Sequence, residues 1–179
     1  NLNVPPTLIS FACADGQKKH IISPEFKEVG NNIYHFYHQN KENGLPDYET
    51  LKEVFDFVHQ QIKAGNIVSV KTIKDGGAAV SLAKMCFGNH LGAEVELAES
   101  QILEKNIGGF IIESKTELAH SQLYKIGKVT EGKTLVINKK AFDLGKLLSA
   151  YTQTFENLFP TAEPDRIEIN IDEKLNSTS

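Results

Sequence analysis

The apolar residues of this chain recur in two patterns, one typical of strands and one typical of helices. Short runs rich in β-branched and aromatic residues predict strands, because such side chains fit a pleated surface. These runs cover residues 7–14, 33–39, 67–73, 92–97, 109–113, 126–130 and 134–138. The first run is apolar on both faces and is therefore expected at the centre of a sheet. The last two runs flank Glu131 and Gly132 and predict a hairpin.

Longer segments with apolar residues three and four positions apart predict helices. Residues 76–87 are apolar nearly all round, which predicts a helix packed on several sides. A helix over 47–64 is expected to begin after an N-cap at Asp47 and to end before Gly65. A short helix is expected over 98–104 and a long one over 141–159. The predicted inward faces are Leu51, Val54, Phe55, Val58 and Ile62 in the 47–64 helix, and Leu144, Leu147, Leu148, Tyr151, Phe155 and Leu158 in the long helix.

Together these elements predict an α+β fold, a mixed sheet packed with helices, in one domain over residues 1–160. After Pro160 the sequence becomes polar and acidic, which predicts a linker over residues 161–179. Ile167, Ile169 and Ile171 alternate there and allow a short edge strand. Because the chain opens on Asn1 without a signal peptide, we expect it to be a piece of a longer protein.

Charge and cysteine content exclude several classes of function. The net charge of −4 comes without a basic stripe, so nucleic-acid binding is not expected. No apolar run reaches the roughly 18 residues that cross a bilayer, so no membrane partner is expected. Two cysteines, Cys13 and Cys86, rule out a disulfide framework and suit a reducing cytoplasm. Neither lies in a zinc-binding spacing, and Cys86 is predicted to be a small core residue.

The loop between the 67–73 strand and the 76–87 helix carries the strongest chemical signal. Lys74-Asp75-Gly76-Gly77 lies at a helix start, where unpaired N–H groups and the helix dipole favour anions. Two glycines let an oxyanion approach the backbone, and Lys74 can add a positive charge. Asp75 can cap the helix or orient a metal-bound water. The same sequence also suits a plain tight turn with an N-cap, and neither a Walker motif nor a G-x-G-x-x-G motif is present.

The histidines and paired acids give weaker signals. His35 and His38 are three apart in a predicted strand, so they point to opposite faces and cannot chelate together. His59 borders an apolar helix face, which is typical of a structural residue. Glu94 and Glu96 alternate on a predicted strand, as expected of a solvated face. The remaining histidines, expected at the surface, are His20, His90 and His120.

Several motifs, in order, resemble the phosphoribosylformylglycinamidine synthase family of purine biosynthesis. They are VPPTLISFA at 4–12, IISPEFK at 21–27, ENGLPD at 42–47, and GG-x-A-x-x-x-AKM-x-FGN-x-x-G at 76–92. The resemblance covers about residues 4–160 and is to the last C-terminal-type domain of the synthetase region, which precedes the glutaminase domain. This domain type is shared with aminoimidazole ribonucleotide (AIR) synthetase, selenophosphate synthetase and thiamine-monophosphate kinase.

The resemblance implies the AIR synthetase C-terminal fold and an ATP-dependent, glutamine-dependent ligase reaction. ATP phosphorylates the amide oxygen of formylglycinamide ribonucleotide, and ammonia from the glutaminase domain then displaces phosphate. ATP and Mg²⁺ are held mainly by an N-terminal-type synthetase domain that this chain lacks. The C-terminal-type domain adds the glycine-pair loop, so the implied partners are the N-terminal-type and glutaminase domains of the same protein.

The loop departs from the family pattern, which reads Asp-Arg-Ser-Asp-Gly-Gly. Thr72 stands where the family has a metal-binding Asp, and Lys74 where it has a nucleotide-contacting Ser. Thr72 has no anionic oxygen, so no metal ligand is expected from this loop. The resemblance carries over best to Asp75, Gly76 and Gly77, while Asn89 and Gly92 are expected to shape the turn after the helix.

Three hypotheses follow. The first is a domain without activity of its own that contributes one wall of a composite nucleotide cleft. The second is a structural or regulatory domain of the same enzyme, whose nucleotide only stabilises the protein. The third is a stand-alone synthetase or kinase of the related superfamily, which would need a carboxylate-rich half that this chain lacks.

Overall fold

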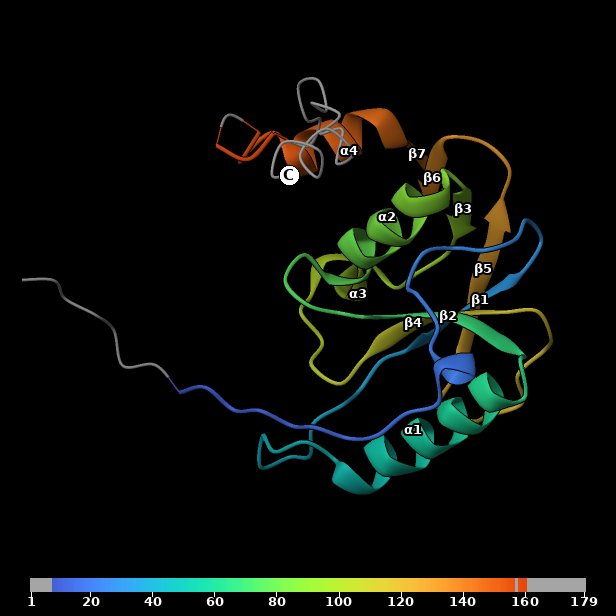
Figure 1. Ribbon diagram of the computed structural model, residues 1–179, viewed down its shortest axis with the longest axis vertical. Helices are drawn as coiled ribbons and strands as arrows, with labels where there is room; N and C mark the ends of the chain where they lie inside the picture. The colour runs from blue at the N-terminus through green and yellow to red at the C-terminus, as the bar shows by residue number, and fades with distance from the viewer. Residues whose placement is uncertain (1–7, 157, 161–179) are drawn as a thin grey trace, which may run out of the picture.

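The computed structural model describes residues 8–156 and 158–160, and in this part of the chain a seven-stranded sheet separates two groups of helices (Figure 1). The predicted 161–179 linker and its isoleucine strand lie outside the described residues. The strands are β1 (Asn32–Phe36), β2 (Ile67–Thr72), β3 (Gly92–Val95), β4 (Phe110–Ser114), β5 (Tyr124–Thr130), β6 (Thr134–Ile137) and β7 (Lys140–Asp143). The helices are η1 (Lys18–His20), α1 (Tyr48–Lys63), α2 (Gly77–Asn89), α3 (Glu99–Leu103) and α4 (Leu144–Thr152).

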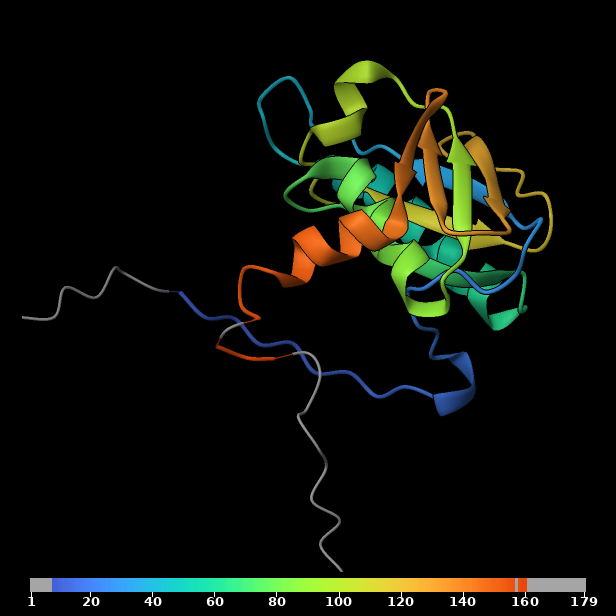
Figure 2. The ribbon, with the colours of Figure 1, turned by 90° about the horizontal axis from the view of Figure 1, so that it is seen from above.

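The sheet is mixed, in the order β2-β4-β1-β5-β3-β6-β7. The β3–β6 pair is parallel and the other pairs are antiparallel. Figure 2 shows β5, β3, β6 and β7 side by side at one end of the sheet. The predicted α+β fold with a mixed sheet is therefore confirmed.

Alternating side chains of the central strands feed two separate cores. Ile33 of β1 and Ile111 of β4 pack under α2, while Tyr34 and Phe36 of β1 pack under α1. Every residue of β1 and β4 is buried, because helices cover both faces of these two strands. As the sequence predicts, α2 is buried on several sides, and Cys86 lies fully inside the core.

Two features of the C-terminal half differ from the predicted hairpin and long helix. Strands form at 126–130 and 134–137, but β3 lies between them, so they do not pair as a hairpin. Instead β6 pairs with β7 across Asn138 and Lys139, which have φ angles of 48° and 66°. Two consecutive positive φ angles are typical of a tight two-residue hairpin turn.

The helix predicted over 141–159 is shorter, running from Leu144 to Thr152. Asp143 ends β7 and caps the helix, because its Oδ1 accepts a hydrogen bond from the Lys146 amide at 2.8 Å. Of the six side chains predicted to face inward, only Leu144 is buried among the described residues. Tyr151, Phe155 and Leu158 are exposed.

The strand predicted over 7–14 is also absent from the described part of this sheet. Residues 8–14 are extended and exposed, and they pair with no strand of the domain. The strand favoured by the apolar pattern therefore has no partner within the described chain.

Candidate functional site

The glycine-pair loop joins the end of β2 to the start of α2. Thr72, Lys74 and Asp75 are exposed, while Ile73 is buried and its amide donates to the Gly109 carbonyl at 3.0 Å. Gly76, the N-cap of α2, has a φ of 88°. The turn is closed by a 3.0 Å hydrogen bond from the Gly77 amide to the Lys74 carbonyl. The loop therefore presents the three side chains on either side of Ile73 to solvent.

The two glycines are required by packing as well as by backbone conformation. A Cβ at Gly77, where φ is 68°, would lie 2.5 Å from the carbonyl oxygen of Ile102. A Cβ at Gly76 would run into the side chain of Val80. Gly77 and Ala78 are buried where the backbone of α3 crosses the start of α2. The groups that an incoming ligand can reach are thus the side chains before the glycines and the edge of Gly76.

The charges around the loop come from two lysines and one carboxylate. Asp75, with 87% of its side chain exposed, forms an ion pair with Lys105 Nζ at 3.0 Å. Of the two roles considered for Asp75, the helix cap does not form, because α2 has no side-chain cap hydrogen bond. The side chain of Lys74 has no hydrogen bond or ion pair with any described residue. A ligand phosphate at this loop would therefore meet one unpaired lysine and one lysine shared with Asp75.

An apolar cavity opens beside the first turns of α2. It has a volume of about 520 Å³ and lies between α2, α3, the β6–β7 hairpin and α4. Its walls include Val80, Ile102, Leu135 and Phe142. Glu99 and Lys140 add charged groups to the lining. The cavity thus offers mainly apolar contact surface within one helical turn of the glycine pair.

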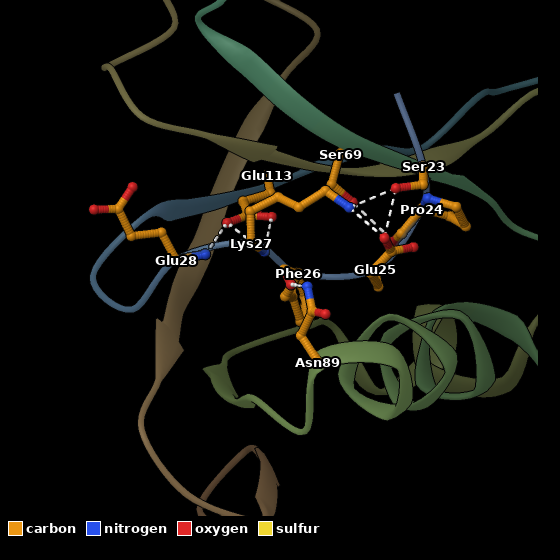
Figure 3. Close-up of polar contacts among 9 residues, drawn as sticks. All are labelled: Ser23, Pro24, Glu25, Phe26, Lys27, Glu28, Ser69, Asn89 and Glu113. Atoms are coloured by element: carbon orange, nitrogen blue, oxygen red, sulfur yellow. Dashed lines mark hydrogen bonds and ion pairs between the residues drawn. The ribbon is translucent and has the colours of Figure 1, made fainter. Parts of the chain in front are cut away.

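Strand β4 also carries a buried carboxylate, Glu113, that no sequence motif indicated (Figure 3). Glu113 is 0% exposed, and its two oxygens accept hydrogen bonds from the Lys27 amide at 3.1 and 2.8 Å. The same carboxylate accepts from the Glu28 amide at 3.1 Å and from Asn31 Nδ2 at 2.7 Å. Burial raises the pKa of Glu113, and the hydrogen bonds from Asn31, Glu28 and Lys27 act against that rise. The sequence offered one sign of this buried carboxylate, because Glu113 is the single charged residue in the otherwise apolar run 110–113.

Lys27 and Glu28 belong to the segment 24–28, called the crossing segment below, and further hydrogen bonds tie this segment to the sheet and to α2. Ser69 Oγ donates to the Pro24 carbonyl at 2.8 Å, and the Phe26 amide donates to the Met85 carbonyl at 2.9 Å. Asn89 Nδ2 donates to the Phe26 carbonyl at 2.8 Å, as Figure 3 shows. Asn89, which the sequence analysis placed at the turn after the helix, therefore also binds the end of α2 to this segment. The network is structural and leaves the glycine-pair loop as the candidate binding element.

The histidines do not assemble into a site. His38 accepts a hydrogen bond from the Asp47 amide at its Nε2 and lies 3.1 Å from the Ile107 carbonyl at its Nδ1. His35 is buried, and burial lowers its pKa to about 4. His120, predicted at the surface, instead packs its ring 4.7 Å from that of Phe57. Within the described ranges, no three His, Cys, Asp or Glu side chains gather as metal ligands would, and no helix has the length and apolar character to cross a bilayer.

Comparison with known proteins identifies the domain. Residues 27–149 match the family model described as AIR synthase related protein, C-terminal domain. The chain is 29% identical over 161 residues to phosphoribosylformylglycinamidine synthase subunit PurL of Methanocaldococcus jannaschii, covering 77% of this chain and 22% of that protein. It is 30% identical over 119 residues to PurL of Zymomonas mobilis, covering 59% of this chain and 16% of that protein.

Solved structures share the fold at low sequence identity. Phosphoribosylformylglycinamidine synthase II of Thermotoga maritima superposes with a TM-score of 0.58 and 13% identity, covering 73% of this chain and 28% of that one. The T. maritima PurL complexed with ATP gives a TM-score of 0.58 and 11% identity, covering 73% of this chain and 27% of that one. This chain therefore spans only a fraction of the length of its relatives. It belongs to the AIR synthase related C-terminal domain family and corresponds to a C-terminal-type domain of the PurL kind.

Proposed function

We propose that this domain forms one wall of a composite nucleotide cleft in an ATP-dependent phosphoribosylformylglycinamidine synthase of the cytoplasm. The observation that carries the proposal is the loop 72–77, which presents the exposed, unpaired side chain of Lys74 in front of a glycine turn at the head of α2. A lysine ammonium is a suitable point charge for phosphate. The family match and the PurL relatives supply the enzyme class.

In this proposal the loop binds and orients, and the chemistry belongs to other parts of the protein. Lys74 contacts ATP phosphates, and Asp75 holds Lys105 next to them through their ion pair. Gly76 and Gly77 allow the turn that presents these side chains at the surface. Thr72 supplies no anionic oxygen, so Mg²⁺ is held by carboxylates outside this chain. The apolar cavity beside α2 is a suitable place for the nucleobase, because it lies within one turn of the loop.

The overall reaction proposed for the whole protein is the conversion of formylglycinamide ribonucleotide to the amidine. ATP activates the amide oxygen as a phosphate ester, and ammonia released from glutamine by a glutaminase domain or subunit displaces the phosphate. An N-terminal-type synthetase domain completes the cleft. This chain by itself has no synthase turnover and negligible affinity for ATP, because it holds one wall only.

A second candidate is a cleft that holds nucleotide for stability without turnover. The observation that favours it is Thr72, which stands where a metal-binding acid is expected, next to a loop whose Gly77 is fixed by packing against α3. Both candidates place nucleotide at the same loop, and they differ in what the nucleotide does.

One experiment separates the two candidates. Lys74→Ala is introduced into the full-length protein, with exposed Lys115→Ala as the matched control. A catalytic cleft predicts a loss of kcat/KM of about tenfold to a hundredfold at unchanged thermal stability, since one charge-assisted contact contributes about 1.5–3 kcal/mol. A stabilising cleft predicts normal turnover and loss of the increase in Tm caused by nucleotide. Unchanged turnover together with an unchanged nucleotide-induced Tm shift would refute both, as would synthase turnover by residues 1–179 alone.

A further inference from the structure

Strand β7 forms one outer edge of the sheet, and all four of its residues are exposed. Within the described chain it pairs with β6 alone, across a two-residue turn, so Ile137 and Lys140 form a hydrogen-bonded pair. The same alternation directs the backbone groups of Phe142 toward β6. It leaves the N–H and C=O of Ala141 and the N–H of Asp143 pointing outward. The edge thus offers a template for one more strand.

The side of β7 that faces the apolar cavity suits an apolar partner. Phe142 is 40% exposed and lines this cavity, as do Lys140 on the same strand and the half-buried Leu147 of α4. Strands that pair place their opposed side chains on the same face of a sheet. A strand that pairs with β7 therefore gains most from apolar side chains at every second position, on the side of Phe142.

The surroundings of this edge are basic. Residues 131–146 contain four lysines and two acids, Glu131 and Asp143, which gives a net charge of +2. All four lysines are exposed, and none forms an ion pair with a described residue: Lys133, Lys139, Lys140 and Lys146. A second copy of this chain would bring its own lysines to the edge, so like charges oppose pairing of two copies. An acidic segment is the complementary partner.

The sequence after Pro160 has the composition and the pattern that such a partner needs. Residues 161–179 contain five acids and two basic residues, which gives a net charge of −3. Residues 167–172 read Ile-Glu-Ile-Asn-Ile-Asp, so apolar and polar side chains alternate as in a strand with one buried face.

The length of the connection allows this segment to reach β7. Helix α4 leaves the sheet at the end of β7, and its nine residues lead the chain about 14 Å away (Figure 2). The chain then turns on itself, because the Phe159 amide donates to the Phe155 carbonyl at 2.7 Å. Residues 161–166 can extend over roughly 20 Å, which is more than the length of α4. A segment that returns in this way meets the end of β7 first and runs antiparallel to it.

We propose that residues 166–171 pair with the outer edge of β7 as an additional, antiparallel strand of this sheet, with the three isoleucines on the side of Phe142. Charge selects the register. With Ile167 opposite Phe142, Arg166 lies opposite Asp143 and Glu168 lies opposite Ala141. A shift of two residues would place Glu168 opposite Asp143, where two like charges oppose pairing.

Amide hydrogen exchange of residues 1–179, measured residue by residue by NMR, tests this pairing. In the proposed register Ala141 and Glu168 exchange both backbone hydrogen bonds, so their two amides should exchange about tenfold or more slowly than unpaired amides. Ile167→Ser should restore fast exchange at both amides, because it removes the side chain next to Phe142. Asn170→Ser, on the opposite face of the segment, is the matched control and should leave both amides protected.

Disulfide trapping tests the register separately, in a Cys13→Ser background that removes the exposed native thiol. Phe142→Cys and Ile167→Cys would form a pair without hydrogen bonds between them, whose Cα atoms lie about 4.5 Å apart and within reach of a disulfide. This pair should cross-link within one chain under mild oxidation. Phe142→Cys with Glu168→Cys, whose side chains would point to opposite faces, should not.

Three outcomes would overturn the proposal. Fast exchange of the Ala141 and Glu168 amides in the unmodified chain would mean that the edge stays unpaired and that its lysines guard it. Protection that increases with protein concentration would mean that a second copy occupies the edge. Equal loss of protection in Ile167→Ser and Asn170→Ser, or equal cross-linking of the two cysteine pairs, would contradict the proposed face and register. No nucleotide is added, so the result is independent of the proposed nucleotide site.

Discussion

Replacing Gly77 by alanine tests whether the glycine pair is fixed by packing against α3. Two costs apply to the Gly77→Ala variant. Alanine at a φ of 68° costs about 1–2 kcal/mol of stability. The new Cβ would lie 2.5 Å from the Ile102 carbonyl oxygen and 2.5 Å from the Leu103 carbonyl carbon, and such overpacking costs about 1–3 kcal/mol.

Gly65→Ala provides the matched control. Gly65 follows α1 with a φ of 77°, but a Cβ there would meet nothing within 4 Å. The control therefore carries the backbone cost without the clash. The difference between the two variants, about 1–3 kcal/mol, isolates the contact between the start of α2 and the backbone of α3.

The assay is urea unfolding of residues 1–179 followed by circular dichroism, with a thermal melt alongside it. For a chain of this size each kcal/mol lowers Tm by about 2–4 °C. Gly77→Ala should thus melt clearly below Gly65→Ala. Equal destabilisation of the two variants would refute the packing argument and would leave an open glycine turn as the explanation of the pair.

Two further predictions concern buried ionisable groups, and a third concerns the loop lysine. His35 has a folded pKa of about 4 against an ordinary value of 6.5, so its neutral form stabilises the fold above pH 6.5, and this stability is lost as pH falls toward 4. The loss is at most about 3 kcal/mol, and His35→Leu should remove that part of the pH dependence in urea unfolding; an unchanged pH slope would contradict it. Glu113→Ala leaves the Lys27, Glu28 and Asn31 donors without their acceptor and should cost about 3–5 kcal/mol in the same assay, whereas exposed Glu94→Ala should stay within about 0.5 kcal/mol. A loss below 1 kcal/mol at Glu113 would show that the crossing segment is held mainly by other contacts. Lys74→Ala should leave the urea midpoint of residues 1–179 unchanged, because the side chain of Lys74 is exposed and has no partner among the described residues; a shifted midpoint would reveal a structural role.

Most elements of the fold could be predicted from local patterns, because their apolar periodicity reflects burial. The two-sided burial of α2, the N-cap position of Asp47 and the positive φ of Gly65 just after α1 follow from residues close in sequence. Pairing could not be predicted in the same way. Strands β5 and β6 are consecutive, but β3 lies between them, and that choice depends on contacts far apart in sequence.

The two errors in element boundaries have specific physical reasons. The β6–β7 turn uses Asn138 and Lys139 at positive φ without a glycine, so it lacks the usual hairpin signal. Asp143 then ends β7 and caps α4. The apolar pattern on both sides of Asp143 had predicted a single helix over 141–159, and it gave no sign of a cap inside that stretch. The strand predicted over 7–14 does not form among the described residues, because residues 8–14 pair with no strand of the sheet.

Part of the candidate site could be predicted from the sequence. The position of Lys74, Asp75 and the glycines between a strand and a helix could be predicted, because strand, turn and helix signals are local. The pairing of Asp75 with Lys105 and the crossing of α3 over Gly77 join segments about thirty residues apart and have no local signal. The hydrogen bonds of Glu113 have no local signal either, since their donors lie more than eighty residues away along the chain.

The central claim is that Lys74 lies at the phosphates of bound ATP. An acyl-phosphate derivative of ATP, which transfers its acyl group to a lysine next to the phosphates, tests this directly in the full-length protein. Lys74 should be acylated, and excess ATP should suppress the reaction, while exposed Lys115 should react weakly and without competition. Acylation of Lys74 to the same extent with and without excess ATP would contradict the account.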